Sequence, residues 1–265
     1  MMSPAAIETV GVCVLAAVVL LPIAFLAYRA RRLSLTWHQR FWWGVNQVLC
    51  RVLWRAAISG PLPIGPNQGA LVICNHRSPM DPCFVELGTH RVIHWLIAKE
   101  YCKDWKLGWF LRMCEVIPTN RAGVDTAATK MAIRLARNGN LVGLFPEGRL
   151  NTTEQVMLPG HPGVALIALK AGVPVIPCHV EGSPYDGTTL GALLMHARVK
   201  VTVGRPIDVS EYRGREGERG VLEELTRRLM QEIARLGGHP EFQPQLAGRF
   251  YKPDEPGKVS SRSLV

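Results

Sequence analysis

The sequence predicts an α/β fold in which helices cover a central β-sheet. Short apolar runs rich in β-branched residues recur between residues 71 and 203, and helical candidates lie between them. Such alternation is typical of a sheet layered with helices. A chain of 265 residues allows one sizeable domain with additional terminal segments.

The expected elements follow in chain order. Strands are expected at residues 71–74, 92–98, 115–118, 141–145, 173–180 and 197–203. Helices are expected at residues 79–88, 105–113, 125–137 and 162–170, with Asp125 as an N-cap. Residues 221–236 predict an amphipathic helix that caps the domain. Together these elements define a predicted globular domain at residues 61–238. Proline, glycine and serine dominate from His239 onward, so residues 239–265 are expected to form a flexible tail.

An uncharged apolar segment at residues 10–28 is long enough to cross a bilayer, and only Pro22 interrupts it. Arginines follow at positions 29, 31 and 32, whereas Glu8 precedes the segment. The positive-inside rule therefore predicts a single-pass transmembrane anchor at residues 1–32, with the domain at residues 61–238 on the cytoplasmic face. The alternative is a cleaved signal peptide, which would carry basic residues before its apolar core.

Residues 33–60 are expected to form an interfacial helical segment. Tryptophans at positions 37, 42, 43 and 54 are interleaved with arginines at positions 40, 51 and 55. Tryptophan favours the headgroup level of a membrane, and arginine favours anionic lipids. An ordinary helix packed on the domain is the alternative, and the two interpretations are compatible.

The charge composition indicates an anionic partner, because the formal net charge is +10 and the sequence pI is about 9.6. The basic residues are scattered, and no zinc-finger, helix-turn-helix or ribonucleoprotein motif is present. A nucleic-acid partner is therefore not expected. A phosphate-bearing lipid bilayer explains the same charge.

The seven cysteines are dispersed and include no Cys-x-x-Cys pair. This pattern predicts reduced, mostly buried thiols. His179 and Glu181 are compatible with metal ligation, but alternation along a buried strand favours a core interpretation. No metal and no cofactor are predicted.

Asn75-His76-Arg-Ser-Pro-Met-Asp81 follows the first expected strand and is the strongest candidate for a catalytic motif. Ser78 and Pro79 predict a helix start, which would let the turn fold His76 back onto Asp81. A carboxylate that bonds one imidazole nitrogen leaves the other able to take a proton from a hydroxyl group. The alternative is a capping box, in which Asp81 only bonds the helix end.

Three further blocks follow. Residues 116–121 end in Arg121, residues 145–148 read Phe-Pro-Glu-Gly, and residues 173–177 read Val-Pro-Val-Ile-Pro. Each block alone has an ordinary interpretation: a solvated surface arginine, a turn and a core strand.

Together and in this order, the four blocks resemble the PlsC-like glycerolipid acyltransferase family, whose type member is 1-acyl-sn-glycerol-3-phosphate acyltransferase. The resemblance covers residues 65–208. It implies a central mixed sheet, a general base at His76 oriented by Asp81, and an acceptor site that includes Arg121, Glu147 and Gly148.

Two departures from the family pattern concern the acceptor site. The family commonly continues Phe-Pro-Glu-Gly with Thr-Arg-Ser, whereas this chain continues with Arg149-Leu-Asn. Arg149 is therefore the candidate to replace the family arginine, and a solvated loop arginine is the alternative. Gly160 and His161 stand where many members have Phe-Lys, which removes one possible anion contact. Lys99 is a further candidate for the phosphate site.

The resemblance implies acyl transfer from a thioester, either acyl-CoA or acyl-carrier protein, to a lysophospholipid. The expected acceptor is 1-acyl-sn-glycerol 3-phosphate, which would give phosphatidate. Lysophosphatidylethanolamine, glycerol 3-phosphate and a lyso-aminolipid are alternative acceptors. A catalytically silent membrane-bound scaffold is a rival hypothesis. A hydrolase with a protein serine is another, although the chain has no Gly-x-Ser-x-Gly motif.

Overall fold

The computed structural model describes residues 12–16, 18–20, 23–25, 28, 35–120 and 125–247. No helix within these ranges combines the length and the apolarity needed to cross a bilayer. The predicted span at residues 10–28 lies partly outside the described ranges, and those of its residues that are described are helical. The transmembrane anchor therefore stays a prediction.

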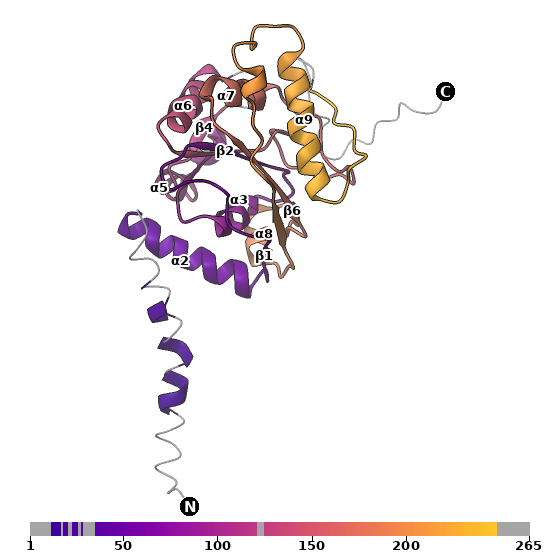
Figure 1. The fold of residues 1–265 in the computed structure, drawn as a ribbon. Helices are drawn as coiled ribbons and strands as arrows, with labels where there is room; N and C mark the ends of the chain where they lie inside the picture. Colours follow the sequence, from indigo (N-terminus) through magenta and orange to yellow (C-terminus); the bar gives the residue numbers. More distant parts are fainter. Residues whose placement is uncertain are drawn as a thin grey trace, which may run out of the picture.

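The strands of the described ranges form a seven-stranded sheet in the order β1-β7-β6-β2-β5-β3-β4. Figure 1 shows helices on both sides of this sheet. Their bounds are β1 Ala57–Ile58, β2 Ala70–Cys74, β3 Ile93–Ala98, β4 Ile117–Thr119, β5 Leu141–Leu144, β6 Val175–Glu181 and β7 Lys200–Val203. Neighbouring strands are parallel except for β6 and β7, which are antiparallel. The predicted α/β fold with a central mixed sheet is thus confirmed.

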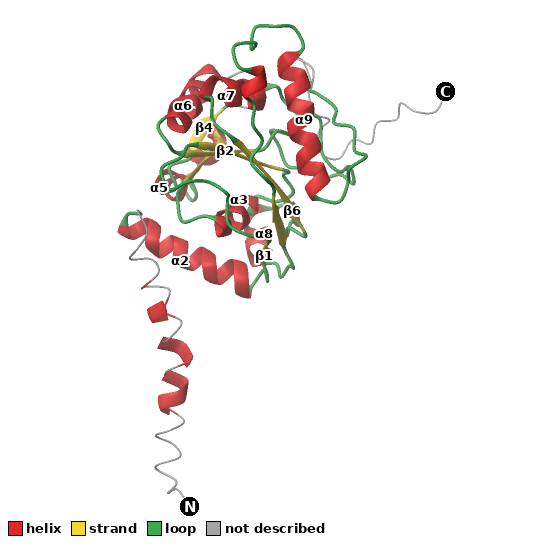
Figure 2. Cartoon of the chain, in the orientation of Figure 1, coloured by secondary structure: helices red, strands yellow, loops and turns green. Residues whose placement is uncertain are grey.

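Helices alternate with these strands along the described chain (Figure 2). Their bounds are α2 Trp37–Val52, α3 Asp81–Val85, α4 Lys99–Lys103, α5 Gly108–Met113, α6 Thr126–Arg137, α7 Gly163–Ala171, α8 Thr189–Leu194 and α9 Val221–Leu236, with 3-10 turns η1 Glu86–Gly88 and η2 Ser210–Tyr212. Asp125 caps α6 by accepting the amide hydrogens of Ala127 and Ala128, as predicted. The sequence interpretation missed β1, α4 and α8.

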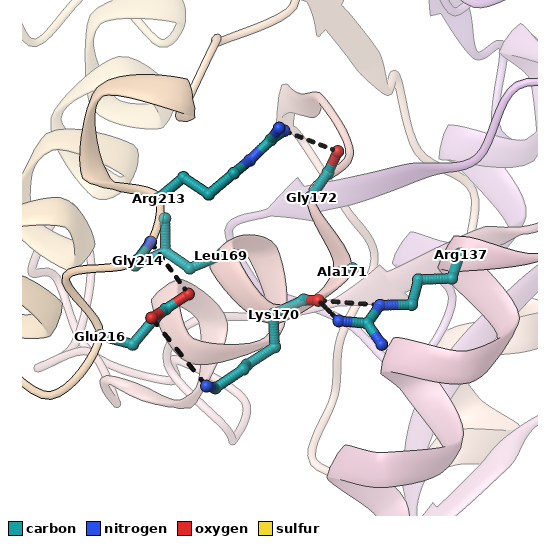
Figure 3. A pocket seen from close by; sticks show the side chains of 8 residues that line it. All are labelled: Arg137, Leu169, Lys170, Ala171, Gly172, Arg213, Gly214 and Glu216. Atoms are coloured by element: carbon teal, nitrogen blue, oxygen red, sulfur yellow. Dashed lines mark hydrogen bonds and ion pairs between the residues drawn. The ribbon is translucent and has the colours of Figure 1, made fainter.

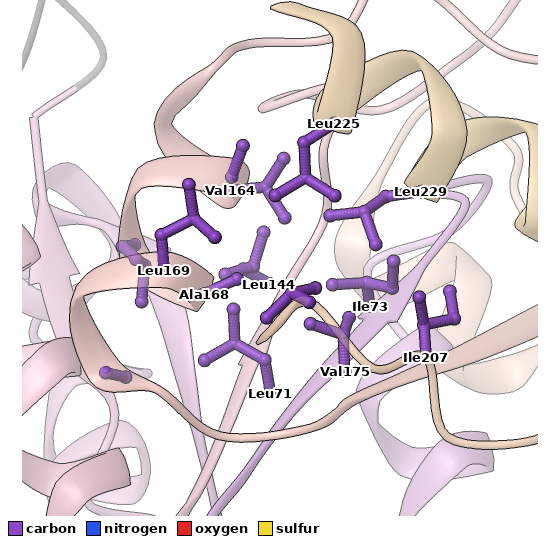
Figure 4. Packing of buried hydrophobic residues seen from close by; sticks show 14 of the residues in the cluster. Leu71, Ile73, Leu144, Val164, Ala168, Leu169, Val175, Ile207, Leu225 and Leu229 are labelled. Carbon is purple, nitrogen blue, oxygen red and sulfur yellow. The ribbon is translucent and has the colours of Figure 1, made fainter. Parts of the chain in front are cut away.

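Two apolar layers bury the two faces of the sheet. Alternate residues of β2 enter opposite layers, so that Leu71 and Ile73 face one side and Val72 faces the other. Figure 4 shows the first layer, where Leu71 and Ile73 pack near Val164 of α7 and Leu225 of α9. All five residues of β2 are buried, as expected for a central parallel strand covered on both faces.

The helix in the predicted interfacial segment is shorter than the sequence suggested. Thr36 and Gln39 form a capping box at the start of α2, and the helix ends at Val52. Ala57 and Ile58 pair with Lys200 and Val201 as strand β1. The last residues of the 33–60 segment therefore belong to the sheet of the catalytic domain.

The parallel strands bring several loops to one edge of the sheet. Because β2, β3, β4 and β5 run in the same direction, the residues that follow them lie along the same edge. In open α/β sheets this carboxyl edge is where ligands bind. The His76 turn follows β2, Lys99 follows β3, and the Phe145–Gly148 block follows β5. The fold thus brings blocks that are distant in sequence to one edge.

Candidate active site

The turn after β2 brings His76 and Asp81 together, as the sequence predicted. The Nδ1 atom of His76 lies 3.0 Å from Oδ2 of Asp81. Asp81 is fully buried, whereas the His76 side chain keeps 16% of its surface exposed. In the described part of the chain, no hydrogen bond occupies Nε2 of His76. The pair therefore offers an oriented imidazole with one nitrogen available for a proton.

Four donors surround the carboxylate of Asp81. Its Oδ2 atom accepts the amide hydrogens of Arg77 at 2.7 Å and Ser78 at 2.8 Å in addition to its contact with His76. Its Oδ1 atom accepts the hydroxyl of Ser183 at 2.6 Å. Asp81 therefore bonds backbone amides as the capping interpretation requires, and it also orients the histidine.

The helix start differs from the prediction. Asp81 is the first residue of α3, Met80 is at the N-cap position, and no side chain caps the helix. Ser78 and Pro79 therefore lie in the preceding turn rather than at the N-cap and first helical position. The amides of Met80 and Asp81 donate to the side chain and the carbonyl of Ser78. Both amides therefore already have acceptors within the turn.

An aromatic stack holds one face of the His76 ring. Phe145 is stacked on it at a centroid distance of 3.7 Å, with 8° between the planes. Trp95 is stacked on the far side of Phe145 at 5.0 Å. A Cβ atom at Gly143 would lie 2.4 Å from the Trp95 ring, so glycine is required in this strand for the stack to form. The stack restricts the orientation of the imidazole.

Glu147 lies beneath the same turn. Its Oε1 atom accepts the amide hydrogen of His76 at 2.8 Å, and its Oε2 atom accepts that of Leu158 at 2.7 Å. Burial raises the pKa of Glu147 to about 7, although both amides oppose the shift. The Glu147 carboxyl group therefore joins the ends of β2 and β5 to the 158 segment and positions the backbone of the catalytic turn.

Gly148, which is exposed, and Arg149, which is half-buried, follow Glu147 in the chain. Gly148 has a φ of +66°, which favours glycine, and a Cβ there would lie 3.0 Å from the His161 ring. Burial, with a smaller contribution from Arg149, lowers the pKa of His161. Arg149 and His161 thus lie close enough to interact electrostatically.

The loop after Arg149 is bound to the catalytic turn. The amide of Asn151 donates to the carbonyl of His76 at 2.7 Å. The guanidinium of Arg77 donates to the carbonyls of Thr153 at 2.5 Å and Gln155 at 2.6 Å. Arg77 therefore secures this loop, a role that the sequence interpretation did not assign.

Lys99 and Arg121 are the remaining predicted substrate-binding residues. The Nζ atom of Lys99 lies 3.0 Å from Oδ2 of Asp125, which also accepts the amide hydrogen of Asn120. Among the described residues, the hydrogen bonds and ion pairs of Lys99 thus lead to Asp125 rather than to His76 or Glu147. Arg121 lies outside the described residues, so its placement stays a prediction.

A hollow at the opposite edge of the sheet from His76 is lined by charged side chains (Figure 3). Its volume is about 410 Å³. Arg137 donates to the carbonyl of Lys170, Arg213 donates to the carbonyl of Gly172, and Lys170 pairs with Glu216 at 3.9 Å. The residues lining it precede β5 and β6 or follow η2, so this hollow is not part of the His76 site.

Besides Arg77, the sequence interpretation did not identify Ser183, Trp95 or the stacking role of the Phe145 ring as contributors to the site. Ser183 follows β6 and lies 102 positions beyond Asp81. Its only sequence signal is its location just after a predicted strand, in the Glu-Gly-Ser turn. Phe145 was noted as part of a block, but nothing local shows which face of the histidine it contacts.

Comparison with known proteins shows which class of protein this chain resembles. A family described as Acyltransferase matches residues 55–181, which include β2, β5, all of β6 and the whole His76 turn. The structure of PlsC from Thermotoga maritima, titled a 1-acyl-sn-glycerophosphate acyltransferase, has the same fold. The TM-score is 0.56 at 20% identity, and the match covers 85% of this chain and 90% of that one. The site therefore lies in an acyltransferase fold.

Relatives with assigned names indicate which kind of acyltransferase this chain resembles. A 1-acyl-sn-glycerol-3-phosphate acyltransferase of Streptococcus pneumoniae is 29% identical over 64% of this chain and 62% of its own length. A protein of the same name from Bacillus subtilis is 26% identical over 55% of this chain and 70% of its own length. The match thus spans less than two thirds of the pneumococcal protein. Together, the family model, these relatives and the shared fold support a PlsC-like glycerolipid acyltransferase family for this chain.

Proposed function

We propose that this protein transfers a fatty acyl group from an acyl thioester to the free hydroxyl of 1-acyl-sn-glycerol 3-phosphate, giving phosphatidate. The observation that carries the proposal is the 3.0 Å contact between His76 and the buried Asp81. The names of the relatives from Streptococcus pneumoniae and Bacillus subtilis support the choice of acceptor.

In the proposed mechanism, His76 acts as the general base through Nε2. It removes the hydroxyl proton of the acceptor while the acceptor oxygen attacks the thioester carbonyl. The tetrahedral intermediate then collapses with cleavage of the carbon–sulfur bond, and the imidazolium returns its proton to the departing thiolate. Asp81 holds Nδ1 protonated and stabilises the imidazolium, so no acyl-enzyme is required.

The acceptor phosphate requires cationic partners, because an unpaired dianion is costly to desolvate. We assign this role to Arg149 and Arg121 with Lys99, and to the backbone at Gly148. The position of Gly148 and Arg149 directly after Glu147, whose carboxylate bonds the amide of His76, supports the assignment. Glu147 contributes indirectly, since its two oxygens bond the amides of His76 and Leu158.

A hydrolase with a protein serine is less well supported. Ser183 donates its hydroxyl to Asp81, on the carboxylate oxygen that does not contact His76. In the part of the chain that the structure describes, no serine hydroxyl bonds Nε2 of His76. A silent scaffold also stays a rival hypothesis, although it would not require an oriented imidazole. The alternative acceptors remain lysophosphatidylethanolamine, glycerol 3-phosphate and a lyso-aminolipid.

The proposed location is the cytoplasmic face of a membrane, with one N-terminal span. The arginines after residue 28 and the tryptophans of α2 support it. Both substrates are amphiphiles, so a site at the bilayer would receive them without exposing their acyl chains to water. Acyl-CoA and acyl-carrier protein are both retained as donors, and neither is a bound cofactor.

The proposal is tested by incubating the purified full chain in detergent–lipid micelles with a labelled acyl thioester and a panel of acceptors. Both donor types are paired with 1-acylglycerol 3-phosphate and with the three alternative acceptors. We expect phosphatidate as the main labelled lipid. Transfer to a different acceptor would correct the substrate, and release of free fatty acid without any transfer would favour a hydrolase. No turnover with any donor and acceptor pair would favour the scaffold.

A further inference from the structure

The segment that contains α4 and α5 exposes large aromatic side chains to solvent. Trp105 is 83% exposed, Trp109 is 50% exposed and Tyr101 is also exposed. Isolated apolar residues are ordinary on a surface, but a group of large aromatics indicates a contact surface. The sequence interpretation predicted only a helix here.

Residues from α2 extend this surface. The Trp42 ring contacts the rings of Trp109 and Phe110 at centroid distances of 5.9 and 5.4 Å. Gln39 also donates to the carbonyl of Met113 and to the carboxylate of Glu115. The N-terminal half of α2 and the α5 helix therefore lie side by side, as in Figure 1. We call the exposed residues of both segments the aromatic face: Trp37, Phe41, Tyr101, Trp105 and Trp109.

The charge around the aromatic face is positive. Helix α2 carries Arg40 and Arg51 and no acidic residue. The segment 99–113 carries four basic residues at positions 99, 103, 106 and 112 against two acidic residues at 100 and 104. The Nζ atom of Lys106 lies 5.5 Å from the centre of the Trp105 ring. Asp104 accepts the amides of Lys106 and Leu107 at the turn before α5. The surface thus combines exposed indoles with excess positive charge.

The aromatic face adjoins the edge of the sheet that carries the candidate active site. Helix α4 begins at Lys99, immediately after β3 ends at Ala98. Strand β3 is parallel to β5, and β5 is parallel to β2. The α4–α5 segment therefore emerges from the same carboxyl edge as the His76 turn.

We propose that the aromatic face rests on an anionic lipid leaflet, so that α4–α5 forms a second membrane contact beside α2. Indole rings favour the interface between headgroups and acyl chains, and the flanking lysines favour anionic headgroups. An acidic protein would complement the lysines, but it would not explain why the exposed aromatics are so large. The contact places a leaflet next to the edge that holds His76. It goes beyond the acyl-transfer proposal and does not depend on turnover.

The proposal is tested with the full chain reconstituted into vesicles of phosphatidylcholine and phosphatidylglycerol whose acyl chains carry bromine. Bromine quenches tryptophan emission only at short range. The emission of Trp105 is obtained as the difference between the wild type and Trp105→Phe. The matched control is Arg227→Trp, which adds a tryptophan at an exposed position of α9, away from the aromatic face.

We expect brominated lipid to remove roughly half or more of the Trp105 emission, and to affect the emission added by Arg227→Trp far less. Replacing Lys103 and Lys106 by glutamine should reduce the quenching of Trp105 by about twofold. The proposal is overturned if Trp105 is quenched by aqueous iodide as strongly as the control and not by bromine. Protection of Trp105 from both quenchers would also overturn it, because it would indicate a protein partner or a second copy of the chain.

Discussion

The two edges of the parallel strands differ in what their charged groups are bonded to. At the carboxyl edge, Asp81 is buried among four donors and orients a histidine whose Nε2 atom has no partner in the described chain. At the amino edge, Arg137 and Arg213 surround a hollow but donate to backbone carbonyls. A hollow lined by cations is therefore weaker evidence for a reactive site than a single oriented imidazole with one ring nitrogen available for a proton.

The largest effect is expected from Asp81→Asn. The side-chain amide of asparagine has only one acceptor oxygen for the donors that now bond Asp81. Its NH2 group would also favour the imidazole tautomer that is protonated on Nε2, which cannot accept the substrate proton there. We expect kcat for acyl transfer to fall by about 10³-fold to 10⁴-fold. The control is Arg213→Ala at the amino edge, which should leave kcat within about twofold of the wild type, as surface changes usually do. Equal losses in both variants would remove the distinction between the two edges.

The next effect is expected from Phe145→Leu, which removes the ring stacked on His76. We expect kcat to fall by about tenfold to a hundredfold because the imidazole gains orientational freedom. The matched control is Phe242→Leu, since Phe242 packs against the other apolar layer. The account predicts that the two variants differ in kcat more than in Tm. A kcat loss that only follows the loss of stability would contradict a positioning role for Phe145.

A smaller effect is expected from Ser183→Ala, which removes the donor to Oδ1 of Asp81. A hydrogen bond to a charged group contributes about 1.5–3 kcal/mol, but three donors to Oδ2 remain, so we expect kcat to fall by about tenfold. Ser210→Ala is the matched control, because Ser210 donates to Asp208 at 2.8 Å in an exposed turn. Steady-state kinetics should show a loss only for the Ser183 variant. A wild-type value of kcat for Ser183→Ala would show that Ser183 does not help to position Asp81 for catalysis.

The smallest expected effect is on the pH dependence of the free energy of unfolding. Burial raises the pKa of Glu147 from 4.5 to about 7. The folded state therefore holds a proton that the unfolded state releases, so stability should fall as the pH rises from about 4.5 to about 7. A shift of this size corresponds to roughly 3 kcal/mol.

Glu147→Gln should flatten this slope, whereas Glu223→Gln on the exposed side of α9 should not. Burial raises the pKa of Glu86 to about 7 as well, so some slope should remain in the Glu147 variant. The free energy of unfolding is measured by urea titration across this pH range. An identical slope in the wild type and Glu147→Gln would show that Glu147 is ionised in the folded protein throughout.

Local sequence pattern was sufficient for the fold class and for the central pair of the site. His76 and Asp81 lie five residues apart, so a strand end and a tight turn were enough to predict their contact. The helix start at Pro79 was wrong because Asp81 bonds the amides of Arg77 and Ser78, which places the turn before the helix. The Ser78-x-x-Asp81 capping pattern predicts the contact with the Ser78 amide, but it does not fix the residue at which the helix begins.

Other features depend on tertiary contacts that a single sequence does not reveal. Strand β1 has two residues and forms only because β7 is beside it. Ser183 reaches Asp81 across the β2–β6 pairing, and Trp42 meets Trp109 across more than sixty positions of sequence. The binding of the acceptor phosphate by Lys99 and Arg121 stays a prediction for a different reason. Lys99 is paired with Asp125, and Arg121 lies outside the described residues.

The assignment of His76 as the general base is tested by measuring kcat for acyl transfer to 1-acylglycerol 3-phosphate in His76→Ala. The matched control is His196→Ala, since His196 is an exposed histidine after α8. The account predicts a loss of about 10³-fold or more for His76→Ala, with Tm near the wild-type value, and no loss for His196→Ala. Near-wild-type transfer by a folded His76→Ala protein would contradict the assignment of His76 as the general base.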